Sequence, residues 1–206
     1  MRILPSDIDR DQTYKLLTGV VVPRPIAWVT SLSEAGHVNL APFSCFTFVS
    51  SEPPMLGISI GRGDKLRLKD TARNIRERGE FTVNIANDSM IATVHASSFE
   101  YPTEVSEVEE LGLATLPGEC IAAPRLRDVP VSLECRFSQL IEFGTACTEF
   151  HVGEVVCFHI RDDLYESGKI RTERLQPICR IAGPNYAQLG PIISQSGGAW
   201  GPRPKS

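Results

Sequence analysis

The chain has 206 residues, of which 42% are hydrophobic and 22% are charged, and its formal net charge is −4. This length and composition are typical of one globular domain, which we expect to span residues 1–206. The weak negative charge argues against a general affinity for nucleic acid or for an acidic membrane surface. The N-terminus lacks the apolar stretch of a secretory signal, and no segment is long and apolar enough to cross a bilayer. We therefore expect a soluble, cytoplasmic protein.

The first part of the chain predicts one short helix followed by strands. Residues 14–19 are typical of a helix that ends at a glycine. Pro42 should restrict its strand to an edge, a bend or a bulge, because proline cannot donate to a sheet ladder. Strands are predicted over residues 26–32, 38–49 and 55–60, with a hairpin loop at residues 34–37.

The middle of the chain predicts helices on either side of a strand. Residues 69–79 contain helix formers, a candidate cap at Asp70 and a terminating glycine. Residues 81–86 are typical of a strand, and residues 88–96 of a helix capped by Asp88. The acidic stretch over residues 97–124 shows weak periodicity, so we expect it to wrap the surface.

The last part of the chain predicts a long hairpin. Residues 131–143 and 149–160 are rich in strand formers, and small residues at 144–147 separate them. The tail over residues 191–206 is rich in Gly, Pro and Ser, and we expect it to be flexible until a partner orders it. Many short strands with two or three helices predict a mainly β fold, an antiparallel barrel or closed sheet decorated by helices.

The segment over residues 61–78 concentrates positive charge in an otherwise acidic chain. A helix that begins near Asp70 and Thr71 offers unpaired N–H groups and the positive end of its dipole. Lys69, just before that helix, would complete a phosphate site. A solvated helix face with outward charges explains the same pattern, so the sequence alone leaves both interpretations open. The basic residues are Arg62, Lys65, Arg67, Lys69, Arg73, Arg76 and Arg78.

Small polar side chains interrupt two of the predicted strands, at residues 30–31 and 39–44. A flat heterocycle with several ring nitrogen and oxygen atoms binds to such a surface, where backbone groups are close and side chains are small. The solvated face of a sheet would carry the same residues. The pattern therefore indicates a ligand surface without excluding an ordinary exposed one.

Other catalytic signatures are missing from the sequence. The six cysteines and four histidines are dispersed, which favours reduced structural thiols and no metal site. We find no serine hydrolase arrangement, no dinucleotide fingerprint and no P-loop. We therefore expect no catalytic side chain, and the role of His159 stays open.

Several stretches together resemble the flavin reductase-like, FMN-binding split-barrel family, which includes flavoredoxins and nitrilotriacetate monooxygenase component B. The resemblance covers about residues 14–190, taken as the core of the domain. It implies a six-stranded antiparallel Greek-key split barrel that forms a homodimer. The matching stretches are residues 24–31, 39–44, 50–54, 69–71 with Asn74, 153–156, His159 and 175–180.

The resemblance also implies which residues bind the cofactor, FMN, with FAD as an alternative. One group would line the flavin and its ribityl chain: Trp28, Thr30 and Ser31. A second would approach the ring edge: Asn39, Ala41, Pro42 and Ser44. A third would lie near the phosphate: Lys69, Asp70, Thr71 and Asn74, together with Ser50 and Arg62.

The implied activity is that of an NAD(P)H-dependent flavin reductase that supplies reduced flavin to a partner monooxygenase. This chain departs from the family pattern at one place that concerns nicotinamide use. Many such reductases carry Gly-Asp-His a few residues before the glycine that is Gly153 here. This chain has Cys-Thr-Glu at residues 147–149 in that region. A flavoredoxin-like protein that exchanges electrons with a ferredoxin-type partner and uses no nicotinamide is therefore the alternative. A flavin-free interaction domain on the same barrel is a third hypothesis.

Overall fold

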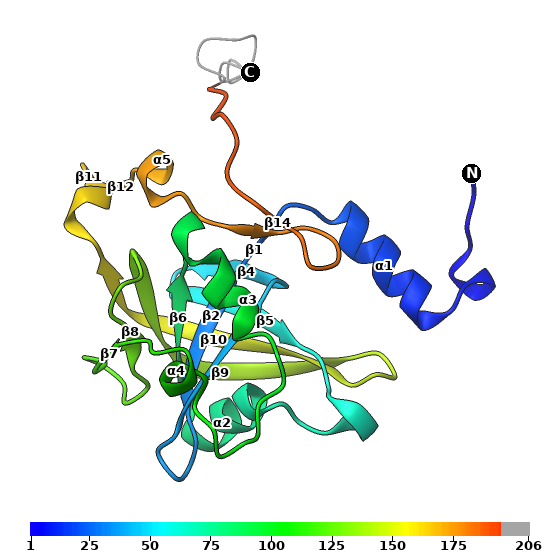
Figure 1. The fold of residues 1–206 in the computed structure, drawn as a ribbon, viewed down its shortest axis with the longest axis horizontal. Coiled ribbons are helices and arrows are strands. Elements are labelled where there is room, and N and C mark those ends of the chain that lie inside the picture. The colour runs from blue at the N-terminus through cyan, green and yellow to red at the C-terminus, as the bar shows by residue number, and fades with distance from the viewer. Residues whose placement is uncertain (195–206) are drawn as a thin grey trace, which may run out of the picture.

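The computed structural model describes residues 1–194 (Figure 1). Most of the tail predicted over residues 191–206 thus lies outside the described residues. The helices are α1 (Arg10–Val20), α2 (Asp70–Arg78), α3 (Ile91–Ala96), α4 (Glu107–Glu110) and α5 (Thr172–Leu175). The strands are β1 (Arg24–Pro25), β2 (Ala27–Leu32), β3 (Val38–Phe43), β4 (Phe46–Ser51), β5 (Pro54–Ile60), β6 (Glu80–Ile85), β7 (Thr115–Leu116), β8 (Arg125–Leu126), β9 (Val131–Phe143), β10 (Thr148–Ile160), β11 (Tyr165–Glu166), β12 (Lys169–Ile170), β13 (Cys179–Arg180) and β14 (Tyr186–Ala187).

One antiparallel sheet of seven strands forms the centre, in the order β3-β2-β6-β9-β10-β5-β4. Its two end strands, β3 and β4, are consecutive parts of one segment that bends at Ser44 and Cys45. The N–H of Ser59 in β5 donates to the carbonyl of Cys45 at 2.8 Å, so the bend itself is bonded to the far end of the sheet. The segment therefore links the two ends of the sheet at the bend, while β3 and β4 each keep one edge without a strand partner in the sheet.

The predicted antiparallel, mainly β fold is confirmed, and the expected count of six strands holds only if the bent segment counts once. The predicted strand over residues 38–49 is in fact two strands, because the backbone turns after Pro42 and Phe43. Pro42 lies on β3, an end strand of the sheet, as predicted. The predicted hairpin loops are also observed between β2 and β3 and between β9 and β10.

The strand β2 supports two apolar cores, one on each face. Ala27 and Val29 point into the barrel, where they pack with Phe81 and Val83 of β6. Side chains of β2 alternate between the two faces, so Trp28 points outward to the second core under α3 and α4. Nearly all of β2 is consequently buried, which fixes the position of the neighbouring β3.

The helix α2 covers one end of the barrel and buries Ala72 and Ile75 in the inner core. Its first residue is Asp70, and the cap position is Lys69, which makes no side-chain capping bond. The predicted cap at Asp70 is therefore wrong, because the Asp70 carboxylate pairs with Arg73 within the first turn. The helix ends at Gly79, whose φ of +70° suits glycine, as predicted.

Three other local predictions require correction. The first helix begins earlier and runs through Gly19, because Asp9 and Gln12 form a capping box. Asn87, not Asp88, precedes the turn that leads into α3, and neither side chain caps it. The acidic stretch over residues 97–124 does not only wrap the surface, since it contributes α4 and buries Val108 in the second core.

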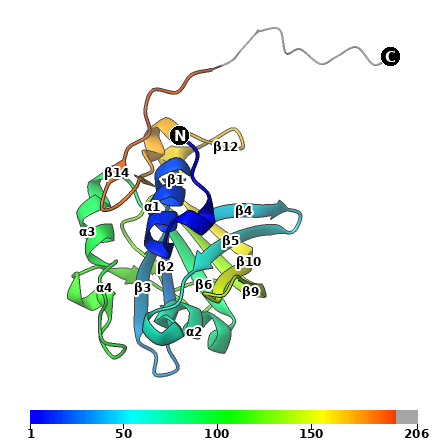
Figure 2. The same cartoon turned by 90° about the vertical axis from the view of Figure 1, so that its right-hand side faces the viewer.

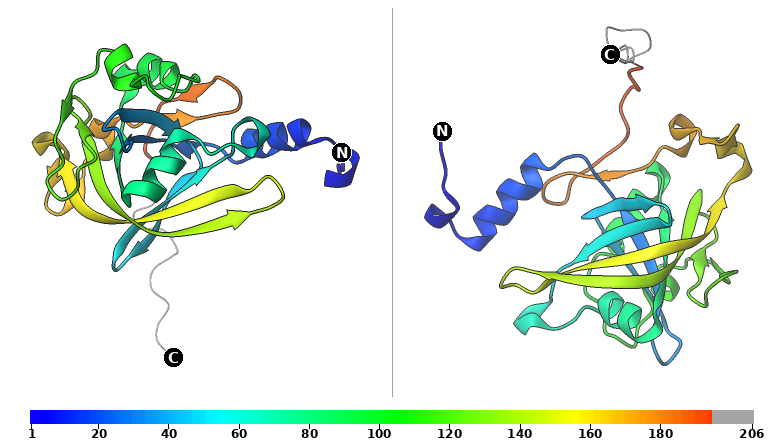
Figure 3. Two further views of the ribbon diagram at one scale, coloured as in Figure 1. Left: turned by 90° about the horizontal axis from the view of Figure 1, so that it is seen from below. Right: turned by 180° about the vertical axis from the view of Figure 1, so that it is seen from behind.

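The helix α1 extends away from the barrel and buries none of its residues (Figure 3). In Figure 2 it stands in front of the barrel, and the hairpin of β4 and β5 extends to one side. Among the helices of residues 1–194, none combines the length and the apolar character that crossing a bilayer requires.

Candidate functional site

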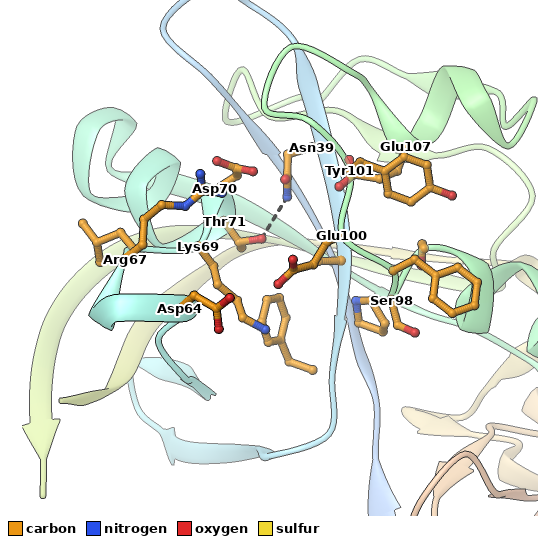
Figure 4. A pocket seen from close by; sticks show the side chains of 17 residues that line it. Asn39, Asp64, Arg67, Lys69, Asp70, Thr71, Ser98, Glu100, Tyr101 and Glu107 are labelled. Atoms are coloured by element: carbon orange, nitrogen blue, oxygen red, sulfur yellow. Dashed lines mark hydrogen bonds between the residues drawn. The ribbon is translucent and has the colours of Figure 1, made fainter. Parts of the chain in front are cut away.

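A cavity of about 340 Å³ lies between β3, the start of α2 and the segment that follows α3 (Figure 4). We call it the β3–α2 cavity. Its apolar wall is formed by Ala41, Pro42 and Phe43 of β3, and Phe99 and Tyr101 lie across from them. The rest of its lining is mainly polar and charged, so the cavity offers one apolar wall opposite converging polar groups, a mixture that occurs in small-molecule sites.

The start of α2 places positive groups at one side of this cavity. Lys69, Asp70 and Thr71 all line it, and no side chain caps the first N–H groups of the helix. In Figure 4 the Lys69 side chain extends toward the middle of the cavity. Uncapped N–H groups at a helix start, beside a lysine, form a binding site for an anion.

Two polar side chains are held together at the upper end of the cavity. The Asn39 amide nitrogen donates to the Thr71 hydroxyl at 2.8 Å, which ties β3 to α2 (Figure 4). Because β3 is an end strand of the large sheet, its backbone next to Pro42 is open to a ligand. The same element therefore supplies both a flat apolar wall and polar edges.

Four acidic residues also line the cavity and oppose an anion: Asp64, Asp70, Glu100 and Glu107. Asp70 is paired with Arg73, and Asp64 and Glu100 are exposed, so solvent screens their charges. Glu107 is buried, which raises the pKa of its carboxyl against the lowering effect of the Leu40 N–H bond at 2.9 Å. The acids therefore oppose the positive groups at the helix start, and pairing or solvent reduces the effect of three of them.

A second cavity, of about 440 Å³, adjoins the first and shares Pro42, Lys69 and Ser98 with it. We call it the Arg24–Arg180 cavity. It lies between the end of α1 and the strands β1 and β13, with Tyr14 and Tyr186 on its walls. The two neighbouring cavities together offer a volume in the range of nucleotide-sized ligands.

The structure brings seven of the thirteen sequence-predicted site residues to these cavities. Six line the β3–α2 cavity: Asn39, Ala41, Pro42, Lys69, Asp70 and Thr71. Ser44 lines the Arg24–Arg180 cavity.

The other six lie elsewhere. Trp28, Thr30, Ser31 and Asn74 are buried behind the cavity wall, with at most 1% of each residue exposed. The Trp28 indole donates to Ser97 at 2.9 Å, and Asn74 donates to Ser31 at 3.1 Å. The Ser50 hydroxyl bonds to Glu52 in the turn after β4, and Arg62 belongs to an ion-pair cluster.

That ion-pair cluster centres on Glu149, a buried carboxylate on β10. Its oxygens accept from Arg62, from Arg76 at 2.5 Å and from His151 at 2.8 Å. Burial lowers the pKa of His151, and the two arginines act in the same direction against the raising effect of Glu149. No local sequence pattern signals this cluster, because its members come from the loop after β5, from α2 and from β10.

A second buried carboxylate, Glu134 on β9, explains the position of His159. It accepts from the N–H groups of Glu119 and Cys120 at 2.8 and 2.7 Å and from His159 at 2.6 Å. Burial raises the pKa of Glu134, but these hydrogen bonds outweigh it and hold the pKa below its ordinary value. Cys157 lies in the same group, within 4.8 Å of the ligand atoms of Glu134 and His159. The hydrogen bonds from Glu119 and Cys120 hold the loop around residue 120 against β9, so the cluster has a structural role.

Cavity residues that sequence reasoning missed come mainly from the acidic stretch and the C-terminal strands. Ser97 to Tyr101 and Glu107 line the β3–α2 cavity, and Tyr14 and Tyr186 line the second one. Only the folded chain brings these segments to β3, so no local pattern identifies them.

Comparison with known proteins identifies the family of this chain. Residues 19–174 match the model of the family described as the flavin reductase like domain. An uncharacterised protein of Halalkalibacterium halodurans is 41% identical over 198 residues, which cover 94% of this chain and 95% of that protein.

Two solved structures are similar over nearly the whole chain. Nitrilotriacetate monooxygenase component B from Bacillus cereus is 37% identical with a TM-score of 0.91, covering 94% of this chain and 98% of that one. The Pseudomonas fluorescens 2-nitrobenzoate 2-nitroreductase NbaA is 31% identical with a TM-score of 0.88, covering 100% of both. These findings confirm the predicted family and support an oxidoreductase enzyme. The chain belongs to the flavin reductase-like family of split-barrel proteins.

Proposed function

We propose that this protein binds FMN and acts as an NAD(P)H-dependent flavin reductase. The observation that carries the proposal is the start of α2, where Lys69 and uncapped helix N–H groups face a cavity with a flat apolar wall. The FMN phosphate would lie at Lys69 and Thr71, and the ring system along Ala41 and Pro42. Membership of the flavin reductase-like family supports this assignment.

The residues present fit such a ligand. A dianionic phosphate gains from the helix dipole and from Lys69. Of the opposing acids, Asp70 is paired with Arg73, and solvent screens the exposed Asp64 and Glu100. In this proposal Trp28, Thr30, Ser31 and Asn74 shape the wall behind β3 from their buried positions. Ser50 and Arg62 have no contact with the ligand.

Bound FMN would supply the redox chemistry, accepting a hydride from a pyridine nucleotide and passing electrons to an acceptor. The protein binds and orients the cofactor, and its apolar wall of Pro42 and Phe43 excludes water from one side of the cavity. No side chain has to transfer a proton in this scheme.

A partner monooxygenase is part of the proposal. The support is the similarity to a protein named as component B of such an enzyme, at 37% identity over 94% of this chain. The whole chain would act as one domain, with residues 14–190 as its core.

Titration of the apoprotein with FMN and FAD, followed by NADH and NADPH, tests this function. We expect tight binding of FMN with quenched fluorescence, and oxidation of at least one pyridine nucleotide at a rate far above that of free FMN. Failure to bind either flavin would refute the proposal as a whole.

One observation favours the alternative, an electron-transfer flavoprotein without nicotinamide use. Residues 147–149 have no Gly-Asp-His, and Glu149 in that region is buried in the Arg62 and Arg76 cluster. Retention of FMN through desalting, together with no oxidation of NADH or NADPH, would establish this alternative.

Glu107→Gln is expected to strengthen FMN binding about 2- to 5-fold, because it removes a negative charge from the cavity. This change corresponds to ~0.4–1 kcal/mol of binding free energy. The glutamine oxygen can still accept the Leu40 N–H bond, so the fold should be preserved. Fluorescence titration with FMN measures the effect. Riboflavin, which lacks the phosphate, should respond much less, and equal gains for both ligands would contradict the placement of the phosphate.

We also propose a homodimer, supported by apolar side chains that no described element covers. Tyr14, Leu17 and Val20 on α1 are 67%, 56% and 74% exposed, and Phe48 on β4 is 75% exposed. Apolar groups gathered on projecting elements are typical of protein interfaces. Sedimentation equilibrium should give twice the mass of the chain, and Leu17→Asp with Val20→Asp should shift the protein toward the monomer.

A further inference from the structure

The Arg24–Arg180 cavity is lined by three cationic residues and no acidic one. Arg24, Lys69 and Arg180 all line it, whereas the β3–α2 cavity contains four acids. None of the three forms an ion pair with a carboxylate among residues 1–194. In a chain of net charge −4, this is a local concentration of uncompensated positive charge.

Two of these cations face each other across paired strands. Arg24 of β1 is the direct cross-strand partner of Arg180 of β13. Like charges at directly opposed positions destabilise a sheet, so the arrangement is unfavourable unless an anion offsets it. In this fold, the unfavourable Arg24–Arg180 pair lies at the wall of a cavity.

Neutral groups hold both guanidinium groups in place. Arg24 is 7% exposed, and it donates to the carbonyls of Thr18, Val21 and Ile181 at 2.7, 2.6 and 3.1 Å. Arg180 donates to the carbonyl of Gly183 at 3.0 Å and to the Tyr186 hydroxyl at 2.5 Å, with its guanidinium carbon 4.6 Å from the Tyr186 ring centre. These contacts orient the groups and leave their charges uncompensated.

We propose that the Arg24–Arg180 cavity binds the pyrophosphate of the pyridine nucleotide, next to the flavin in the β3–α2 cavity. This assignment rests on the proposed function and names the subsite of its second substrate. A pyrophosphate carries two negative charges, which match the opposed arginines better than the single charge of a carboxylate does. Lys69 borders both cavities, so the FMN phosphate and the pyrophosphate would share its charge.

Arg180→Gln separates this subsite from the flavin site, because Arg180 does not line the β3–α2 cavity. We expect KM for NADH or NADPH to rise roughly tenfold or more, with kcat and FMN affinity changed by less than about twofold. Arg127→Gln is the matched control, since Arg127 is exposed and lines neither cavity. It should leave KM unchanged.

Calorimetric titration with inorganic pyrophosphate tests the subsite without turnover. The FMN-loaded wild type and Arg127→Gln should bind it, and Arg180→Gln should bind it at least fivefold more weakly. Benzoate is the second probe: tighter binding of benzoate than of pyrophosphate would overturn the assignment in favour of an aromatic acid. A larger loss of FMN than of riboflavin affinity in Arg180→Gln would overturn it too, because the FMN phosphate would then occupy the cavity. If pyrophosphate binds as expected but no nucleotide is oxidised, the reductase function fails and the anion subsite stands.

Discussion

Replacing Glu149 by alanine is expected to lower the free energy of unfolding by about 3–5 kcal/mol, the cost of breaking a buried ion pair by removing one partner. The carboxylate is buried on β10 and accepts from Arg62, Arg76 and His151. Without it, Arg76 loses its carboxylate partner and Arg62 keeps only the half-exposed Glu142, at the end of the barrel that α2 covers. Urea denaturation followed by circular dichroism measures the loss.

Glu142→Ala is the matched control for this prediction. Glu142 contacts the same Arg62 at 3.4 Å, but its side chain is 49% exposed, so its loss should cost less than about 1 kcal/mol. Equal losses of unfolding free energy in the two variants would contradict the prediction, because burial of Glu149 would then not increase its contribution to stability.

The stability of the wild type should also depend on pH through His151. Burial holds the folded-state pKa of His151 below 6.5, so the unfolded chain binds its proton more readily. Stability is therefore expected to fall as the pH drops below about 6.5. In Glu149→Ala the raising effect of the carboxylate on this pKa disappears, and the loss on acidification should be steeper.

Lys69→Ala is expected to weaken FMN by about 1.5–3 kcal/mol, or roughly 10- to 150-fold, the value of a charge-assisted contact. Riboflavin should lose less than about twofold, because it lacks the phosphate that Lys69 would bind. Fluorescence quenching titrations with the two ligands give the comparison directly.

Lys65→Ala is the control, since Lys65 lies in the same basic segment and does not line the β3–α2 cavity. It should leave both affinities unchanged. A parallel loss of FMN and riboflavin in Lys69→Ala would place Lys69 against the ring system or the ribityl chain, contrary to the proposal.

The sequence predicted the barrel well, because its strands follow local rules. Residues 131–143 and the following strand combine strand formers with a turn of small residues, and they form β9 and β10 almost at the predicted bounds. Gly79 ends α2 where its left-handed backbone is needed. Pro42 predicted an edge, a bend or a bulge, and β3 is an end strand of the sheet.

The candidate site was predictable only in part. Lys69 and Thr71 line the cavity, as predicted. Their place could be predicted because the start of a helix can be recognised from the local sequence. The places of Thr30 and Ser31 depend on which face of β2 the rest of the chain covers, and both are buried. Arg62 was grouped with the other basic residues by its charge, but its actual partner, Glu149, is distant in sequence.

The bend at Ser44 and Cys45 links ligand binding to the integrity of the barrel. One half of this segment, β3, forms a wall of the cavity, and the other half, β4, is the last strand of the sheet. A ligand bound along β3 would therefore stabilise the place where the two end strands of the sheet meet. The free energy of binding would add to the free energy of unfolding. Amide hydrogen exchange should slow on FMN addition in β4 as well as in β3, although β4 contributes nothing to the cavity wall.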